Sequence, residues 1–102
     1  MAKTRLEFQK FLENLKGDRS VYFQPPSTVL MNFPAIRYNL AQLNDISADN
    51  ADYQKFKAYL VTYITFDPDD PMIVTLSNLE YSRFEQWYAK DNLNHYVYTI
   101  FF

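Results

Sequence analysis

The residues that most often carry out catalysis are scarce in this chain. Its 102 residues include one histidine, His95, one glycine, Gly17, and no cysteine. Histidine is the usual general base near neutral pH, reactive thiolates require cysteine, and the loops that hold phosphate groups require several glycines. No serine has the flanking glycines of a nucleophile elbow. The composition therefore argues against an enzyme and predicts that the protein uses no cofactor.

Clustered aspartates are the second group that could do chemistry. Asp67, Asp69 and Asp70 have the alternating spacing of calcium ligands, but no glycine turns the loop and no glutamate follows at a ligand position. Asp70 followed by Pro71 is instead typical of a helix N-cap and first turn. We predict turn and capping roles and no metal site. A second acidic group has no better ligand spacing and is expected to be a solvated loop: Asp45, Asp49 and Asp52.

The N-terminal part of the chain predicts one helix and two strands. Thr4 to Lys16 opens with a capping box formed by Thr4 and Glu7, continues with apolar residues at helical spacing, and ends at Gly17. A short extended run from Ser20 to Gln24, with Val21, Tyr22 and Phe23 at its centre, predicts a brief or edge strand that two prolines stop. Residues 34–44 alternate between apolar and polar side chains, which indicates a half-buried strand.

The C-terminal part predicts three strands and a second helix. A polar loop over 44–52 precedes residues 55–66, whose long alternation predicts the longest, central strand. A short helix begins at the Asp70 cap and ends near Asn78. Two aromatic runs, Tyr81 to Ala89 and Tyr96 to Phe102, are joined by a four-to-six-residue connection within 90–95 and are expected to pair antiparallel.

Together these elements predict a single α+β domain over residues 1–102. The order α-β-β-β-α-β-β suggests an antiparallel or mixed sheet of four to five strands, covered on one face by two flanking helices. No apolar run approaches the roughly 18 residues of a membrane helix. A net charge of −2 and scattered basic residues argue against binding to the phosphate backbone of nucleic acid. We therefore expect a soluble, unexported protein with no membrane partner.

Aromatic side chains are in excess and predict a protein interface. They make up 19% of the chain, and thirteen of the nineteen lie in its second half. A domain of about 100 residues buries only about two-thirds of its unfolded surface, so some rings should remain at the monomer surface. The alternation within 55–66 leaves open which face is buried. We predict that Tyr59 and Tyr63 face outward, because a phenol hydroxyl can stay in water.

Five further residues are candidates for the same interface. Arg37 and Arg83 are expected either to lie over the sheet edge or to form salt bridges between subunits. His95 is expected to be a turn residue at a hairpin end, with interface contact as the alternative. Phe101 and Phe102 should contribute to the core or to a subunit contact, because leaving them in water would forgo about 1.5 to 3 kcal/mol each.

Three parts of the chain carry a family resemblance. They read SVYFQPP at 20–26 with MNFPAIRY at 31–38, FDPDDP at 66–71, and AKDNLNHYVY at 89–98. Together they resemble small proteins from the morphogenesis region of long-tailed bacteriophages, described as tail terminator or tail completion proteins. The DNLNH run is the most specific part, and Lys90 departs from the small or polar residue expected before it.

The resemblance implies a structural protein of the virion, assembled in the host cytoplasm. Such a protein would form a hexameric ring that caps the tail tube protein and faces the head-side connector or stopper protein. DNA would pass through the ring without sequence-specific binding, and the acidic loop around Asp49 could repel it from the lumen. Two alternatives remain: a head–tail joining or adaptor protein of the neck, and a small host-directed protein-binding module.

Overall fold

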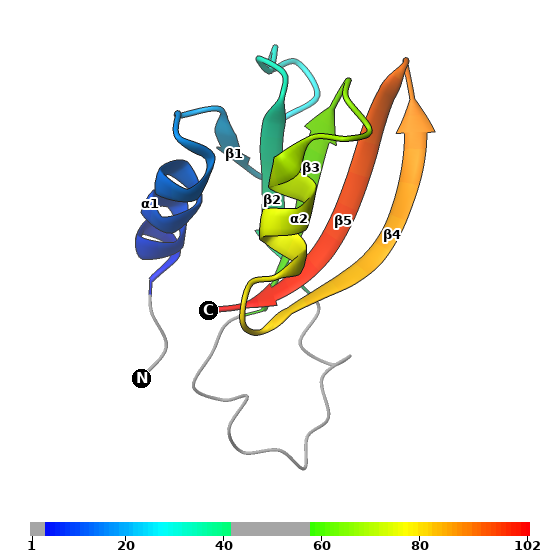
Figure 1. Ribbon diagram of the computed structural model, residues 1–102. Helices are drawn as coiled ribbons and strands as arrows, with labels where there is room; N and C mark the ends of the chain where they lie inside the picture. Colours follow the sequence, from blue (N-terminus) through cyan, green and yellow to red (C-terminus); the bar gives the residue numbers. More distant parts are fainter. Residues whose placement is uncertain (1–3, 42–57) are drawn as a thin grey trace.

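The computed structural model describes residues 4–41 and 58–102 and shows the predicted α+β fold. The elements follow the predicted order α-β-β-β-α-β-β. Five strands form one mixed sheet in the order β1-β2-β3-β5-β4 (Figure 1). The predicted acidic loop, with Asp45, Asp49 and Asp52, lies outside the described residues, so its place in a ring stays a prediction.

Helix α1 spans Arg5–Lys16, and its capping box forms as predicted. The Thr4 hydroxyl accepts a hydrogen bond from the Glu7 amide at 3.2 Å, and the Glu7 carboxylate accepts one from the Thr4 amide at 3.2 Å. Gly17 ends the helix with a left-handed φ of 89°, a conformation that is sterically costly for other residues. Its amide donates to the Glu13 carbonyl at 2.8 Å.

One parallel and three antiparallel strand pairs build the sheet. Strand β1 (Val21–Phe23) runs parallel to β2 (Ala35–Leu40). The remaining pairs are antiparallel: β2 with β3 (Ala58–Thr65), β3 with β5 (Leu93–Phe101), and β5 with β4 (Ser82–Lys90). Strand β2 ends four residues earlier than predicted. Strand β3 is central, as predicted, but its eight described residues are fewer than the nine each of β4 and β5.

The turn between β4 and β5 is tighter than predicted. It consists of Asp91 and Asn92, with φ of 55° and 64°, and two left-handed residues are what a two-residue hairpin turn needs. Aspartate and asparagine tolerate this conformation better than most residues. The prediction of a longer connection over 90–95 is therefore wrong. Lys90 belongs to β4, and His95 is the third residue of β5 rather than a turn residue.

Helix α2 spans Pro71–Ser77 and follows its predicted start signal. Asp70 is the N-cap, and its carboxylate accepts a hydrogen bond from the Met72 amide at 2.9 Å. Pro71 occupies the first helical position, where its missing N–H leaves no intrahelical bond unmade. Asn78 is the C-cap, which confirms the predicted end of the helix.

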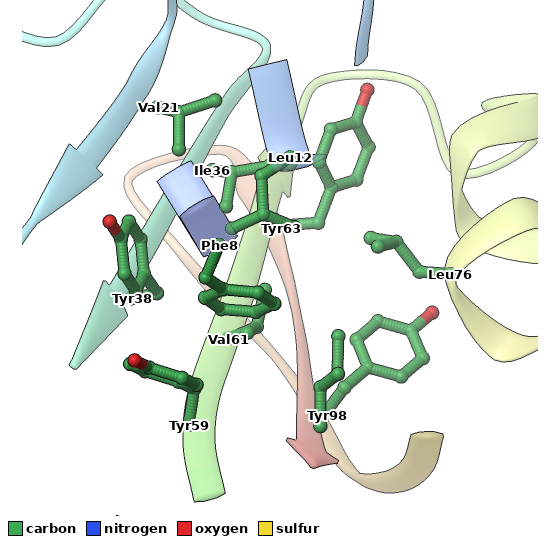
Figure 2. Packing of buried hydrophobic residues seen from close by; sticks show 11 residues of the cluster. Phe8, Leu12, Val21, Ile36, Tyr38, Tyr59, Val61, Tyr63, Leu76 and Tyr98 are labelled. Carbon is green, nitrogen blue, oxygen red and sulfur yellow. The ribbon is translucent and has the colours of Figure 1, made fainter. Parts of the chain in front are cut away.

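Both helices cover the same face of the sheet, as predicted (Figure 1). Phe8 and Leu12 of α1 and Leu76 of α2 pack in one cluster with side chains from four strands (Figure 2). The sheet residues of this cluster are Val21, Ile36, Tyr38, Tyr59, Val61, Tyr63, Tyr98 and Ile100. Four tyrosine rings therefore form a large part of the core.

Candidate protein interface

The prediction that Tyr59 and Tyr63 face outward is wrong. Their side chains lie beneath the helices, with only 0% and 2% of the residues exposed. Tyr59 stacks on Phe8 with ring centroids 4.2 Å apart. Both rings are on the face of β3 that α1 and α2 cover, where burying their large apolar area is favourable. Neither ring is available to a partner in the folded subunit.

The Tyr63 hydroxyl is satisfied within the core by the cap of α2. It donates to Asp70 Oδ2 at 2.6 Å, and the Thr65 hydroxyl donates to the same oxygen at 3.0 Å. Burial, and next the bond to the Asp70 carboxylate, raise the pKa of Tyr63. Burial acts to raise the pKa of Asp70, but hydrogen bonds from Tyr63, the Met72 amide and Thr65 outweigh it and hold that pKa below its ordinary value. This network fixes α2 on β3.

His95 is a buried strand residue and not an exposed contact. Only 8% of it is exposed, because the Tyr88 ring stacks on the imidazole with centroids 4.6 Å apart. Its Nδ1 lies 3.2 Å from the Leu93 carbonyl oxygen. Burial lowers the pKa of His95, and the positive charge of Arg37 adds to this effect, while the Leu93 carbonyl opposes it. Near neutral pH the ring is therefore uncharged.

The two candidate arginines lie on the sheet surface. Arg83 and Arg37 are both exposed. Arg83 is paired within the subunit, with its Nη2 2.8 Å from Glu85 Oε2, and the Thr99 hydroxyl donates to the same oxygen at 2.6 Å. These contacts, with that of Thr99 the largest, lower the pKa of Glu85. A salt bridge from either arginine to another subunit stays a prediction.

Phe102 packs against the core, which is one of the two roles predicted for the C-terminal aromatics. Phe102 packs on Phe8 and Phe11 of α1, with ring centroids 4.9 Å and 5.2 Å apart. Phe101 pairs with Ala58 in the sheet, and its amide donates to the Tyr81 carbonyl at 3.0 Å. Both phenylalanines are half-buried, so this segment joins α1 to the edge of the hairpin.

Three exposed aromatic rings lie together on β4. Phe84, Trp87 and Tyr88, named here the β4 aromatic patch, are 51%, 53% and 38% exposed. Strand β4 is at the edge of the sheet and pairs only with β5 among the described strands (Figure 1). All its residues after Ser82 are exposed. An edge strand presents unpaired N–H and C=O groups, so β4 combines free backbone donors and acceptors with apolar side chains.

The patch occupies both faces of the strand. Phe84 and Trp87 lie opposite Tyr98 and Tyr96 of β5, on the face that the helices cover. Phe84 contacts the Tyr98 ring edge-on, with centroids 5.6 Å apart. Tyr88 lies on the other face. A register shift between Phe84 and Gln86 marks a β-bulge, so the regular ladder continues from Gln86 to Lys90.

The amino-acid sequence contains one signal for this edge that the interface prediction did not use. Central and edge strands can show the same alternation, but charged side chains between aromatic ones are typical of an edge. Arg83 and Glu85 interrupt the aromatic run in this way and Lys90 follows it, whereas the charged residues of the predicted strand 55–66 lie only at its start, at Lys55 and Lys57.

The three sequence stretches of the family resemblance meet at one end of the sheet. The Phe33 ring contacts the Phe66 ring edge-on, with centroids 6.1 Å apart. The Asn94 amide donates to the Phe66 carbonyl at 3.4 Å, and Asn94 Oδ1 accepts from Trp87 Nε1 at 3.3 Å. Figure 1 shows the β1–β2 and β3–α2 connections and the β4–β5 turn at this end. Phe66 is exposed beside them.

Comparisons with protein families, curated proteins and solved structures find no match. Within residues 4–41 and 58–102, no three His, Asp or Glu side chains gather closely enough to hold a metal ion. Neither described helix has the length and apolar character needed to span a membrane.

Proposed function

We propose that this protein is a structural subunit of a bacteriophage neck that caps the tail tube as a ring of identical copies. It acts as a tail terminator, through contacts with its own copies, the tail tube protein and the head-side connector. It performs no catalysis and needs no cofactor. DNA passes the ring as cargo, and the place of action is the virion.

The observation that carries this proposal is the β4 aromatic patch on an unpaired sheet edge. Aromatic residues are enriched where proteins meet, and charged residues at the rim of such surfaces set orientation more than affinity. Phe84 and Trp87 are about half exposed in a subunit that buries four tyrosines completely or nearly so. Solvent-facing Trp and Phe on an edge strand favour aggregation unless a partner covers them. An assembly subunit has such a partner.

The meeting of the resemblance stretches supports the same proposal. Phe33, Phe66 and Asn94 come from three separate parts of the chain and lie together at one end of the sheet. Exposed Phe66 gives this end of the sheet a contact surface that adjoins the β4 aromatic patch through the hydrogen bond between Trp87 and Asn94. A ring subunit needs both a lateral contact to its neighbour and an axial contact to the tube or connector, and the strand edge and the end of the sheet suit those two tasks.

Removing the gene from the phage that encodes this chain tests the proposal. We expect DNA-filled heads without tails, together with tail tubes of uncontrolled length, in electron micrographs of the lysate. Tails of normal length beside heads that have lost their DNA would favour an adaptor instead. Normal virions would overturn a neck function and favour a host-directed binding module.

Complementation links the phenotype to the β4 aromatic patch. The wild-type chain supplied from a plasmid should restore virions, and Trp87→Asp should not. Leu6→Asp is the matched control, because Leu6 is 62% exposed on α1, away from β4. It should restore virions as the wild type does.

A further inference from the structure

The straight part of β4, Gln86 to Lys90, is suited to accept a chain segment from another molecule. It is exposed along its length, and no described strand lies beyond it. In an antiparallel pair alternate residues direct their N–H and C=O groups away from the partner strand, so this edge offers a short ladder of free hydrogen-bonding groups. Trp87 and Tyr88 supply apolar contact on its two faces.

The edge is protected against pairing with an identical edge. The bulge between Phe84 and Gln86 interrupts its ladder, and Arg83, Glu85 and Lys90 place charges along it. Bulges and charged residues are the devices by which edge strands avoid edge-to-edge association. A different segment of a second copy is therefore the better occupant.

The opposite edge of the sheet is closed by α1. Strand β1 has only three residues, and its Val21 carbonyl already accepts a hydrogen bond from Gln9 Nε2 of α1 at 3.0 Å. Strand β1 therefore has too few free backbone N–H and C=O groups to pair with β4 of a neighbouring copy.

The segment Val29 to Asn32, in the connection between β1 and β2, has the properties of an occupant. Leu30 is 93% exposed, and Leu30 and Met31 form no hydrogen bond with the described residues. The Asn32 amide donates to the Tyr22 hydroxyl at 3.2 Å, which holds the segment beside β1, at the edge opposite β4. Residues 24–36 carry no charge, so the segment can approach the mixed charges of β4 without repulsion.

The register of the sheet places the Val29–Asn32 segment and the Gln86–Lys90 edge at about the same height along the strands. Ala35 pairs with Ile64, Ile64 with His95, and His95 with Tyr88, so Ala35 and Tyr88 lie in one row across the sheet. The Val29–Asn32 segment enters β2 just before Ala35. A neighbouring copy displaced sideways along this row brings its segment to Gln86–Lys90 with little shift along the strands.

We propose that Val29–Asn32 of one copy docks on the Gln86–Lys90 edge of the next, with Leu30 against the β4 aromatic patch. The contact joins two different surfaces, so it repeats from copy to copy and closes into a ring when the rotation allows. This proposal rests on the proposed ring function and identifies its lateral contact.

Cysteine cross-linking tests the contact, because the natural chain contains no cysteine. The double variant Leu30→Cys/Ala89→Cys changes two exposed positions, and circular dichroism verifies its fold. Treated with a short bismaleimide, both as purified protein and on capped tail tubes, it should give a ladder of linked subunits that ends at the ring size. The matched control Leu30→Cys/Val74→Cys places the second thiol on exposed α2 and should remain unlinked.

Each outcome of the cross-linking experiment supports or contradicts the proposed contact or the proposed ring function. Dimers from Ala89→Cys alone would show that two β4 edges pair about a two-fold axis and would overturn the proposal, as would the absence of a ladder in both preparations. Rings without links mean that the lateral contact lies elsewhere while the ring function holds. A ladder in a protein that does not cap tails means that the contact is real and the neck function is wrong.

Discussion

The hydroxyl oxygen of Tyr63 lies 2.6 Å from Oδ2 of Asp70, and this bond joins the central strand to the cap of α2. The same carboxylate holds the Met72 amide through its other oxygen, at 2.9 Å. One side chain thus starts the helix and attaches it to the sheet. The short acidic run after β3 therefore has a structural role. Asp70 stabilises the core, although it lies among aspartates whose spacing suggests a cation-binding loop.

Removing the Tyr63 hydroxyl should destabilise the fold. Tyr63→Phe loses a hydrogen bond to a charged group, and we expect the free energy of unfolding to fall by about 1.5 kcal/mol. Tyr59→Phe is the matched variant, since the Tyr59 hydroxyl is buried and has no hydrogen-bond partner among residues 4–41 and 58–102. Its unfolding free energy should be unchanged or rise by up to about 1 kcal/mol. Urea unfolding measures both, and equal losses would show that the Tyr59 hydroxyl is satisfied.

Stability should depend on the Asp70 charge at acidic pH. The folded-state pKa lies below the ordinary value of 3.8, so the folded protein favours the ionised form. The resulting stabilisation is complete above the unfolded pKa and is lost as the pH falls through the folded one. Asp70→Asn keeps a good N-cap and removes the titration. Between about pH 5 and pH 2 the wild type should lose more unfolding free energy than this variant.

The neighbouring residue supplies the control for that pH dependence. Asp69 is exposed, and its carboxylate accepts no hydrogen bond from the described residues. Asp69→Asn removes one negative charge at nearly the same place in the chain. It should leave the pH dependence of the unfolding free energy close to that of the wild type. If Asp69→Asn and Asp70→Asn weaken this pH dependence equally, the change comes from net charge and not from the Asp70 hydrogen bonds.

Local sequence signals predicted the ends of the helices well. Each helix end depends on interactions between residues only a few positions apart, so the local sequence is enough to predict it. The residues concerned are Thr4 with Glu7, Gly17, and Asp70 with Pro71. The length of the β4–β5 turn was harder to predict from the sequence. Aspartate and asparagine are turn residues in many settings, and the positive φ at both positions becomes necessary only once the strands pair directly across them.

The buried face of β3 could not be chosen from its own alternation. Tyr59 and Tyr63 alternate with Leu60 and Ile64, and both sets are apolar enough to enter a core. The choice depends on where α1 and α2 dock, which is a property of the whole chain. The interface prediction therefore selected two buried tyrosines, whereas the exposed rings include Phe84, Trp87 and Tyr88 of the edge strand β4.

Truncating Phe102 should weaken the attachment of α1 to the sheet. Its ring lies against Phe8 and Phe11, so Phe102→Ala removes apolar contact and should lower the unfolding free energy by about 2 kcal/mol. Leu6→Ala, on the exposed side of α1, should change it by less than about 0.5 kcal/mol. Thermal and urea unfolding compare the two, and similar small effects would mean that Phe102 does not pack on the helix in solution.

His95 should titrate below the ordinary histidine value in the folded protein. Burial beneath Tyr88 disfavours the imidazolium and lowers the pKa from 6.5, so the stabilisation from a neutral His95 is complete above about pH 6.5 and declines as the pH falls. Because the chain has one histidine, its ring resonances report this pKa directly by NMR. Tyr88→Ala uncovers the ring and should move the pKa upward, whereas Phe84→Ala on the other face of β4 should leave it unchanged. A folded-state pKa at the unfolded value in the wild type would show that His95 is solvated, and its place beneath Tyr88 would then be wrong.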